Sequence, residues 1–312
     1  RAWKAFYAGL LRLYPEPTCK VLVDAIAEYY GLKSSQVFVG VGSDDVLAMI
    51  FMTFFNSKTP VWFPDITYSF YDVWAELFRI PYKQMPLDEN FRLKIDDYKG
   101  ENGGIVFPNP NAPTGIYESL DHVEEIIKNN PDVIVIVDEA YIDFGGETAL
   151  PLIDKYDNLV VVRTFSKSRS MAGLRIGYAI SNPELIKALN DVKYSYNSYT
   201  MNRPSLVLGV ESIHDDAYFR EKVGQIIATR ERFVKEIAEL GFTCLPSSAN
   251  FVFATHESIP AKEIFAAAKE NNIYVRYFDK PRIDNYLRIS IGTDAEMDVF
   301  VSFLSKYVKE YK

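Results

Sequence analysis

Two stretches of the sequence decide its fold: Val133-Ile-Val-Ile-Val137, which leads into Asp138-Glu-Ala-Tyr141, and Leu159-Val-Val-Val162, which leads into Arg163-Thr-Phe-Ser-Lys167. Both begin as short apolar runs rich in β-branched residues, without polar alternation. Such runs are typical of strands that are covered on both faces, as in a parallel sheet. Each run ends at chemically active side chains, so we expect a site at the edge where the strands end.

The same alternation continues along the chain before these runs. Apolar runs at 37–41, 60–64 and 105–107 are followed by helical patterns at 46–55, 68–78 and 119–128. A repeated strand-then-helix order predicts an α/β fold with a mostly parallel central sheet. We place this large domain at residues 25–205.

The last third of the sequence has a different pattern. A long charged amphipathic helix is expected at 218–240, closed by Gly241. Short strands at 251–253, 273–275 and 287–291, with helices at 261–270 and 294–309, follow it. This mixture predicts a smaller α+β domain at residues 206–312. Residues 1–24 remain as an N-terminal segment, which we expect to pack with the smaller domain.

Composition narrows the class of protein. The 312 residues are 48% hydrophobic and 24% charged, as in a globular enzyme, and the net charge is 34 − 42 = −8. So acidic a chain is a poor candidate for nucleic-acid binding. No apolar run approaches the roughly 20 residues that span a bilayer. Two cysteines and three scattered histidines offer no metal-ligand spacing, so we expect no metal. Without a signal peptide at its start, the chain is expected to be cytoplasmic.

Small and polar residues gather at the expected strand ends. Gly42-Ser43-Asp44 opens a helix, and such a start suits a phosphate because its backbone N–H groups are free and its dipole end is positive. An ordinary helix cap would explain the same residues. A dinucleotide fingerprint is excluded, because the third glycine after Gly40 and Gly42 is missing.

Asp138 and Lys167 are more informative together than apart. A carboxylate at the end of a buried strand needs a cation or a hydrogen-bond donor, and a single lysine is usually a solvated surface residue. Both, however, stand at the ends of successive strands. A lysine, a buried carboxylate and a phosphate-ready helix start are what pyridoxal phosphate requires: an amine for its aldehyde, a partner for its ring nitrogen and amides for its phosphate.

These residues belong to a longer pattern. Thr164-Phe-Ser-Lys-Ser-Arg-Ser-Met-Ala-Gly-Leu-Arg-Ile-Gly-Tyr178 resembles the signature of class II pyridoxal-phosphate aminotransferases of the aspartate aminotransferase fold, with arginine eight residues after lysine. Within that superfamily the chain is most similar to histidinol-phosphate aminotransferases, through Leu13-Tyr-Pro-Glu-Pro17, Val41-Gly-Ser-Asp-Asp45 and Leu287-Arg-Ile-Ser-Ile-Gly292. The resemblance covers nearly the whole chain. It implies the fold type I architecture and pyridoxal 5′-phosphate as cofactor.

The resemblance also implies roles around the cofactor ring. Lys167 would bind the cofactor aldehyde and then move the proton, Asp138 would pair with the ring nitrogen, and Tyr68 would stack on the ring. Tyr141 would hydrogen-bond the ring hydroxyl. The family usually adds an asparagine where this chain has Ala112. We rank Asn111 first as its substitute, and Asn109, or another donor beside Tyr141, stays open.

A second set of roles concerns anions. The resemblance implies that Ser166 and Arg175 hold the cofactor phosphate together with Ser43 and Asp44. Tyr14 would reach the phosphate in the neighbouring subunit, so the enzyme would be a homodimer with a shared active site, and the N-terminal segment would also touch the partner.

Two arginines remain for the substrate. Arg288 matches the family's substrate-anion arginine, and Arg276 is a second candidate, since a guanidinium grips phosphate or carboxylate through two hydrogen bonds. As alternatives, Arg288 could be the outward position of a strand and Arg276 part of any edge strand.

The implied reaction is the transfer of an amino group from histidinol phosphate to 2-oxoglutarate, a step of histidine biosynthesis that yields imidazole acetol phosphate and glutamate. A threonine-phosphate decarboxylase of cobalamin synthesis and an aromatic amino-acid aminotransferase would use the same cofactor shell and stay as alternatives. A non-catalytic module is disfavoured, because it would not need the lysine, the ring-nitrogen acid and the phosphate arginine together.

Overall fold

The computed structural model describes residues 12–311, and the chain forms two compact units. The first unit comprises residues 12–109 together with Glu118–Ala140 and Glu147–Phe219. The second comprises Pro110–Tyr117, Tyr141–Gly146 and the residues from Arg220 onward. Two short loops from the first half of the chain therefore belong with the last third.

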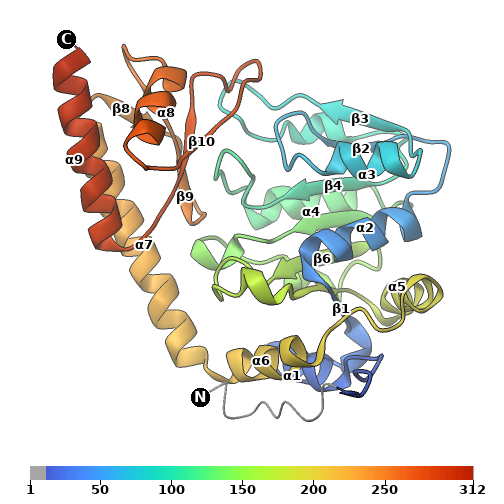
Figure 1. The fold of residues 1–312 in the computed structure, drawn as a ribbon. Helices are drawn as coiled ribbons and strands as arrows, with labels where there is room; N and C mark the ends of the chain where they lie inside the picture. The colour runs from blue at the N-terminus through green and yellow to red at the C-terminus, as the bar shows by residue number, and fades with distance from the viewer. Residues whose placement is uncertain (1–11, 312) are drawn as a thin grey trace. The chain divides into compact units, whose positions relative to one another are not determined.

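A seven-stranded sheet forms the centre of the first unit, in the order β1-β7-β6-β5-β4-β2-β3 (Figure 1). Its strands are β1 Val37–Gly40, β2 Val61–Pro64, β3 Tyr82–Met85, β4 Ile105–Pro108, β5 Val135–Asp138, β6 Leu159–Thr164 and β7 Gly177–Ile180. β7 runs antiparallel to both of its neighbours, β6 and β1, while the pairs from β6 to β3 are parallel. The predicted mostly parallel sheet is confirmed.

Helices bury this sheet on both faces. They are α1 Lys20–Tyr30, α2 Gly42–Phe54, α3 Tyr71–Leu77, α4 Leu120–Lys128, α5 Pro183–Tyr196 and α6 Arg203–His214. Along β5, Val135 and Val137 pack in one apolar cluster with α1, α4 and α6, whereas Ile136 packs in another with α2, α3 and α5. Because alternate side chains of a strand point to opposite faces, each face has its own core and the strand carries no polar residue until its end.

The second unit holds a four-stranded antiparallel sheet in the order β10-β11-β9-β8. Its strands are β8 Phe242–Cys244, β9 Phe251–His256, β10 Arg276–Tyr277 and β11 Leu287–Ser290. Helices α8 Ala261–Glu270 and α9 Asp294–Tyr311 pack with them, and α7 Asp216–Ala238 enters from the first unit. The strand expected at 273–275 is wrong in position, because pairing with β11 begins only at Arg276.

The described part of the predicted N-terminal segment, residues 12–24, is part of the first unit. Lys193 of α5, which is fully buried, donates to the Pro17 carbonyl oxygen at 3.0 Å, and Arg203 of α6 donates to the Tyr14 carbonyl oxygen at 2.9 Å. Residues 1–11 of that segment lie outside the described part. No helix within residues 12–311 is both long enough and apolar enough to cross a membrane.

Candidate active site

The parallel strands of the first unit carry the predicted residues to one edge of the sheet. Ser43 and Asp44 follow β1, Asp138 is the last residue of β5, and Ser166 and Lys167 follow β6. Strands that run in the same direction end on the same side, so the order of the sheet collects groups that are far apart in sequence.

The helix start after β1 is held by a close backbone approach. Gly177 of β7 packs so tightly on it that an added Cβ would lie 2.2 Å from the Gly42 carbonyl carbon and 2.3 Å from the Ser43 nitrogen. Gly42 itself has a φ of 84°, a conformation that favours glycine. The first N–H groups of α2 are therefore fixed in place by two glycines, and such groups have no partner inside their own helix.

Asp44 joins two other predicted residues at this helix start. Its carboxylate accepts hydrogen bonds from the Tyr68 hydroxyl at 2.8 Å and from Nη2 of Arg175 at 3.0 Å. The guanidinium of Arg175 also lies over Gly42, where an added Cβ would come within 2.4 Å of Nη2. A guanidinium beside a helix start makes an anion site, and here Asp44 supplies its negative partner.

Asp138 is a buried carboxylate whose oxygens are both hydrogen-bonded. Tyr71 donates its hydroxyl to Oδ2 at 3.0 Å, and the Ala140 N–H donates to Oδ1 at 3.2 Å. The side chain is almost inaccessible to water, and this burial raises the pKa of Asp138 to about 6. The two donors and the charge of Lys167 act against that rise, whereas Asp44 adds to it. Such a carboxylate is poised to pair with a cation.

Lys167 stands in the turn after β6. Its side chain is half-buried, and its positive charge favours the ionised form of Asp138. Ser166, next to it, is held by Thr164, whose hydroxyl donates to the Ser166 Oγ at 3.0 Å and accepts from its N–H at 3.1 Å. The structure thus places an amine, a buried carboxylate and an anion-binding helix start within one unit.

Tyr141 and Asn111 belong to the second unit. Tyr141 packs its ring edge-on against Phe251, with centroids 5.1 Å apart. Asn111 is buried and donates its Nδ2 to the Thr114 hydroxyl at 2.9 Å. Asn109, the other candidate for the ring hydroxyl, belongs to the first unit, and both ends of its side-chain amide bind the backbone of Glu118.

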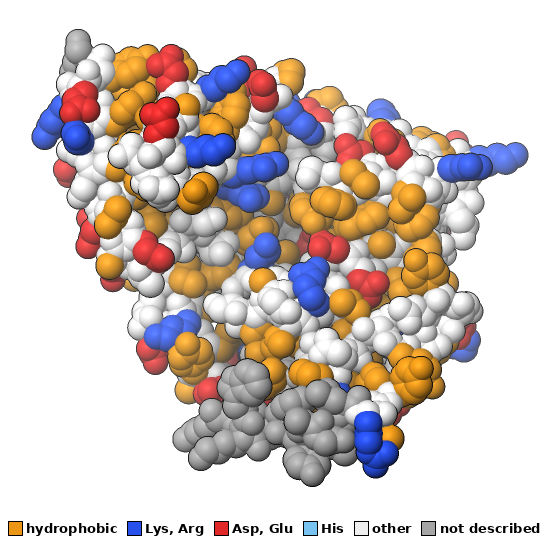
Figure 2. Space-filling view, in the orientation of Figure 1, with side chains coloured by type: hydrophobic (Ala, Val, Ile, Leu, Met, Phe, Trp, Pro, Cys, Tyr) orange, Lys and Arg blue, Asp and Glu red, His pale blue; other side chains and the backbone are white. Residues whose placement is uncertain are grey.

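Arg276 and Arg288 also lie in the second unit, on adjacent strands. They are direct partners in the antiparallel pairing of β10 with β11. Both guanidinium carbons lie over the ring of Phe278, at 5.3 Å for Arg276 and 5.8 Å for Arg288. Neither guanidinium forms an ion pair with a carboxylate among residues 12–311. Figure 2 shows several basic side chains on this face over the region of β10.

Tyr14 is placed apart from the other predicted residues. Its side chain is 81% exposed, and its ring packs on Tyr199 with centroids 4.9 Å apart. Within the described chain no hydrogen bond joins Tyr14 to Asp44, Arg175 or the α2 start.

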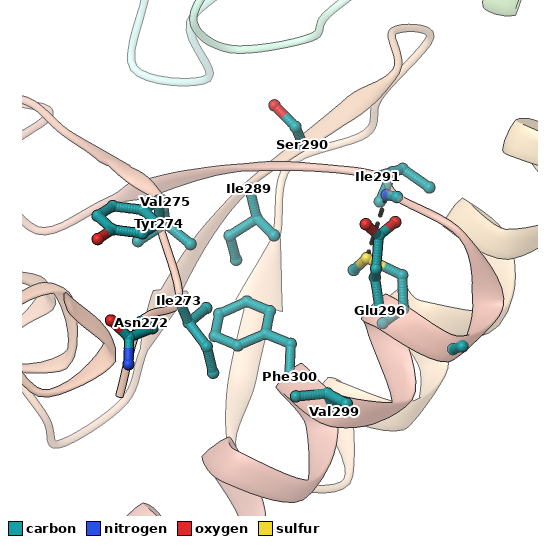
Figure 3. Close-up of a pocket in the computed structure, with 13 residues that line it drawn as sticks. Asn272, Ile273, Tyr274, Val275, Ile289, Ser290, Ile291, Glu296, Val299 and Phe300 are labelled. Atoms are coloured by element: carbon teal, nitrogen blue, oxygen red, sulfur yellow. Dashed lines mark hydrogen bonds between the residues drawn. The ribbon is translucent and has the colours of Figure 1, made fainter. Parts of the chain in front are cut away.

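A hollow of about 630 Å³ in the second unit contains none of the predicted residues (Figure 3). Its walls are largely apolar, with Ile273, Val275, Ile289 and Phe300 among them, and the N–H of Gly292 donates to the sulfur of Met297 at 3.3 Å nearby. Because it lacks a lysine, an arginine or a buried acid, this hollow does not offer the chemistry collected at the strand ends.

Sequence reasoning missed two buried groups beside the site. One is Tyr71, the first residue of α3 and the donor to Asp138; Tyr68 lies outside this helix, so no helical spacing in the sequence points to the contact. The other is the ion pair between Glu139 and Arg163, whose Nε donates to Oε2 at 2.9 Å. This pair has no sequence signal, because Arg163 sits inside a strand that is otherwise apolar.

Comparison with known proteins identifies the class to which this site belongs. Residues 5–304 match the family model for aminotransferase class I and II. The chain is 49% identical over 300 residues to histidinol-phosphate aminotransferase of Clostridium botulinum (strain Okra / Type B1), covering 96% of this chain and 85% of the relative. It is 51% identical over 304 residues to the enzyme of the same name from Lactococcus lactis subsp. cremoris (strain SK11), covering 97% and 85%.

A solved structure agrees with these matches. Histidinol-phosphate aminotransferase from Sinorhizobium meliloti, in complex with pyridoxal-5′-phosphate, has a TM-score of 0.90 at 24% identity and covers 100% of this chain and 86% of its own. The chain belongs to the aminotransferase class I and II family and has the fold of its pyridoxal-phosphate enzymes. Within that family it falls among the histidinol-phosphate aminotransferases.

The residues present fit the cofactor of this family, pyridoxal 5′-phosphate. The helix start under Arg175, kept open by Gly42 and Gly177, suits a phosphate. The buried and hydrogen-bonded carboxylate of Asp138 suits a protonated ring nitrogen, and Lys167 supplies the amine.

Proposed function

We propose that the protein transfers the amino group of histidinol phosphate to 2-oxoglutarate, yielding imidazole acetol phosphate and glutamate in histidine biosynthesis. Its relatives at about half identity carry the name of this activity. The structural observation that carries the proposal is the pair Arg276 and Arg288, two adjacent guanidinium groups without an acidic partner among residues 12–311. A phosphorylated amine supplies the dianion that such a pair binds.

The arginine pair is pre-oriented for that task. Phe278 contacts both guanidinium groups, and Phe251 contacts Arg288 at 5.2 Å, so the aromatic rings limit the conformations that the side chains adopt. Binding an anion then costs less side-chain entropy than it would with two free arginines. The phosphate also relieves the repulsion between the two positive charges.

The cofactor phosphate would be held at the start of α2 by Ser43 and Asp44, with Ser166 and Arg175 beside it. Here the N–H groups of the helix start and the guanidinium of Arg175 supply the donors. The Asp44 side chain orients Arg175 and Tyr68 through its two hydrogen bonds. It therefore contributes as a support for the phosphate ligands rather than through its own charge.

The cofactor ring would be held by Asp138 at its nitrogen and by Tyr68 at its face, with Tyr141 and Asn111 assigned to its hydroxyl. When bound, pyridoxal phosphate supplies an aldehyde for amines and a ring that withdraws electrons from the substrate α-carbon. Asp138, ionised by its two donors, favours the protonated ring nitrogen on which that withdrawal depends.

Lys167 carries the proton transfers in this proposal. Its Nζ would hold the cofactor aldehyde while no substrate is bound. As a free amine, Lys167 would take the proton from the substrate α-carbon and return it, as a general base and then a general acid. The turn after β6 keeps Lys167 on the same sheet edge as Asp138. The amine that moves the proton and the carboxylate assigned to the ring nitrogen therefore share one rigid scaffold.

We further propose a homodimer in which Tyr14 serves the active site of the partner subunit. Its exposed ring, braced by Tyr199, and the 73% exposed Tyr196 nearby in the chain give the first unit an aromatic surface that a second copy would cover. Tyrosine is favoured at such surfaces because its ring is apolar and its hydroxyl still bonds.

A visible absorption spectrum of the purified protein tests the function. The absorption band of the bound cofactor should bleach on addition of histidinol phosphate and return on addition of 2-oxoglutarate. A band that ignores histidinol phosphate but responds to threonine phosphate with release of carbon dioxide would replace amino transfer with decarboxylation. A response to aromatic amino acids alone would replace the substrate. No band after incubation with pyridoxal phosphate would contradict the assignment of Lys167.

A further inference from the structure

Tyr71 connects two of the residues assigned to the cofactor ring. It is the first residue of α3 and is completely buried. Its hydroxyl donates to Oδ2 of Asp138 at 3.0 Å, and its ring meets that of Tyr68 edge-on, with centroids 5.7 Å apart.

The ring of Tyr71 is fixed from several sides. Phe51 of α2 stacks on it with centroids 6.3 Å apart, Phe63 of β2 meets it at 5.8 Å, and Trp74 one turn further along α3 lies at 6.3 Å. A buried side chain in such a setting keeps one rotamer. The hydroxyl is therefore delivered to Asp138 by a rigid aromatic cluster that spans a strand and two helices.

We propose that Tyr71 is a positioning residue: through its hydrogen bond it holds the Asp138 carboxylate ionised and in the orientation in which it meets the cofactor ring nitrogen. The inference rests on the proposed role of Asp138. It assigns Tyr71 no contact with substrate or cofactor, only an action through Asp138. The Ala140 N–H donates to Oδ1, so both carboxylate oxygens of Asp138 accept a hydrogen bond.

The electrostatics support this role. Burial raises the pKa of Asp138 to about 6, and the Tyr71 hydroxyl is the strongest of the influences that lower it. The other charged groups that face the carboxylate are Asp44 from α2, which raises the pKa, and Lys167 after β6, which lowers it. Removing the hydroxyl leaves a buried carboxylate with one donor fewer, and its pKa must rise.

The first test is Tyr71→Phe in the full-length chain, with Asp138 followed by carbon-13 NMR of its carboxyl group in the absence of cofactor. The ring packing is kept and only the hydroxyl is lost. We expect the pKa of Asp138 to rise by about 1 unit or more, the usual effect of a hydrogen bond to a charged group. The matched control is Tyr29→Phe, which removes a hydroxyl from Asp216, at 2.6 Å, and should leave Asp138 unchanged.

The second test is a double-mutant cycle on the affinity for pyridoxal phosphate. Tyr71→Phe should weaken binding in the wild-type background and have no further effect when Asp138→Asn is already present, because Tyr71 acts only through Asp138. In turnover, kcat should fall while the KM for histidinol phosphate stays constant. Additive losses in the cycle would overturn the inference, as would an unchanged Asp138 pKa.

A third variant keeps the proposal testable if Tyr71→Phe does not fold. Incorporation of 3-fluorotyrosine at position 71 retains the hydroxyl and makes it a stronger acid, so the pKa of Asp138 should fall instead of rise. An unchanged pKa here would again contradict the inference. Wild-type protein that fails to bind pyridoxal phosphate would instead contradict the proposed function, so the two failures are distinguishable.

Discussion

Arg276 and Arg288 stand directly opposite each other in the pairing of β10 with β11, and both contact the ring of Phe278. Like charges at directly opposite positions destabilise a sheet. The pair therefore weakens the pairing of β10 with β11, and this is the arrangement for which we propose an anion as the partner of both arginines.

Replacing either arginine with alanine should lower kcat/KM for histidinol phosphate by about 10- to 100-fold, because each guanidinium provides charge-assisted hydrogen bonds to the phosphate. Histidinol without its phosphate is the control substrate, and its kcat/KM should change little. Thermal unfolding should be unaffected or shifted upward in Arg276→Ala, since a repulsion is removed. Equal losses on both substrates would contradict the phosphate assignment.

Lys167→Ala should abolish turnover and leave the fold intact, because the side chain is half-buried in a turn and is not part of either apolar cluster. Reduction with borohydride followed by mass spectrometry should add the cofactor to the wild-type chain and not to the variant. Lys187→Ala, which removes an exposed lysine that pairs with Asp191, is the control and should retain both activity and labelling. Normal turnover by Lys167→Ala would contradict the proposed role of Lys167 in proton transfer.

The raised pKa of Asp138 predicts how the cofactor-free protein depends on pH. Between the unfolded value of 3.8 and the folded value of about 6, the native state binds more protons than the unfolded state, so stability falls as pH rises through this window. The difference of about 2 pKa units corresponds to about 3 kcal/mol. Asp138→Asn should therefore be more stable than wild type above about pH 6 and lose that advantage near pH 4. A gap in melting temperature that does not change with pH would show that the carboxylate charge is not the cause.

Gly177→Ala should weaken the phosphate site without removing any side chain that is assigned to it. The new Cβ would collide with the backbone of Gly42 and Ser43, which cannot move without displacing the start of α2. Affinity for pyridoxal phosphate should fall much more than affinity for pyridoxal, which lacks the phosphate. Gly173→Ala is the matched control, because nothing lies within 4 Å of its added Cβ.

A shared active site can be tested by mixing two weak variants. Subunits with Tyr14→Ala and subunits with Lys167→Ala should each have low activity. A mixed dimer would contain one site with an intact Lys167 and an intact Tyr14 from the partner, so activity should reappear after mixing and re-association. If mixing restores nothing while both variants still form dimers, Tyr14 acts within its own subunit or not at all.

Much of the fold could be predicted because apolar runs without polar alternation are a strong signal. The runs at β1, β2, β4, β5 and β6 were all predicted as strands. β7 and β3 were missed: the former is hidden within the aminotransferase signature, and the latter, Tyr82–Met85, is an edge strand of mixed polarity. The helix after β1 begins at Gly42 rather than at residue 46, because the polar residues 43–45 already have helical geometry.

The candidate site was predictable where a residue's position at a strand end implies its neighbours. Asp138, Lys167 and Ser43 follow from this rule alone. The support of Asp138 by Tyr71 could not be predicted, because it joins residues 67 positions apart through a packed cluster. Nor could residues 110–117 and 141–146 be assigned to the second unit from their order in the chain, since the side chains they pack against come later than residue 219.

That assignment has a consequence for synthesis on the ribosome. When the chain has been translated as far as Phe219, the seven strands of the large sheet are present, but Ala112 and Tyr141 still lack Ala249 and Phe251, on which they pack. The Phe144 carbonyl likewise awaits the side chain of Arg230. The nascent protein therefore carries two loops with uncovered apolar side chains until about thirty more residues emerge. A chain that ended in that interval would have a large sheet with two loops whose apolar side chains stay exposed. Such a product would be prone to aggregation and degradation and would not be a smaller enzyme.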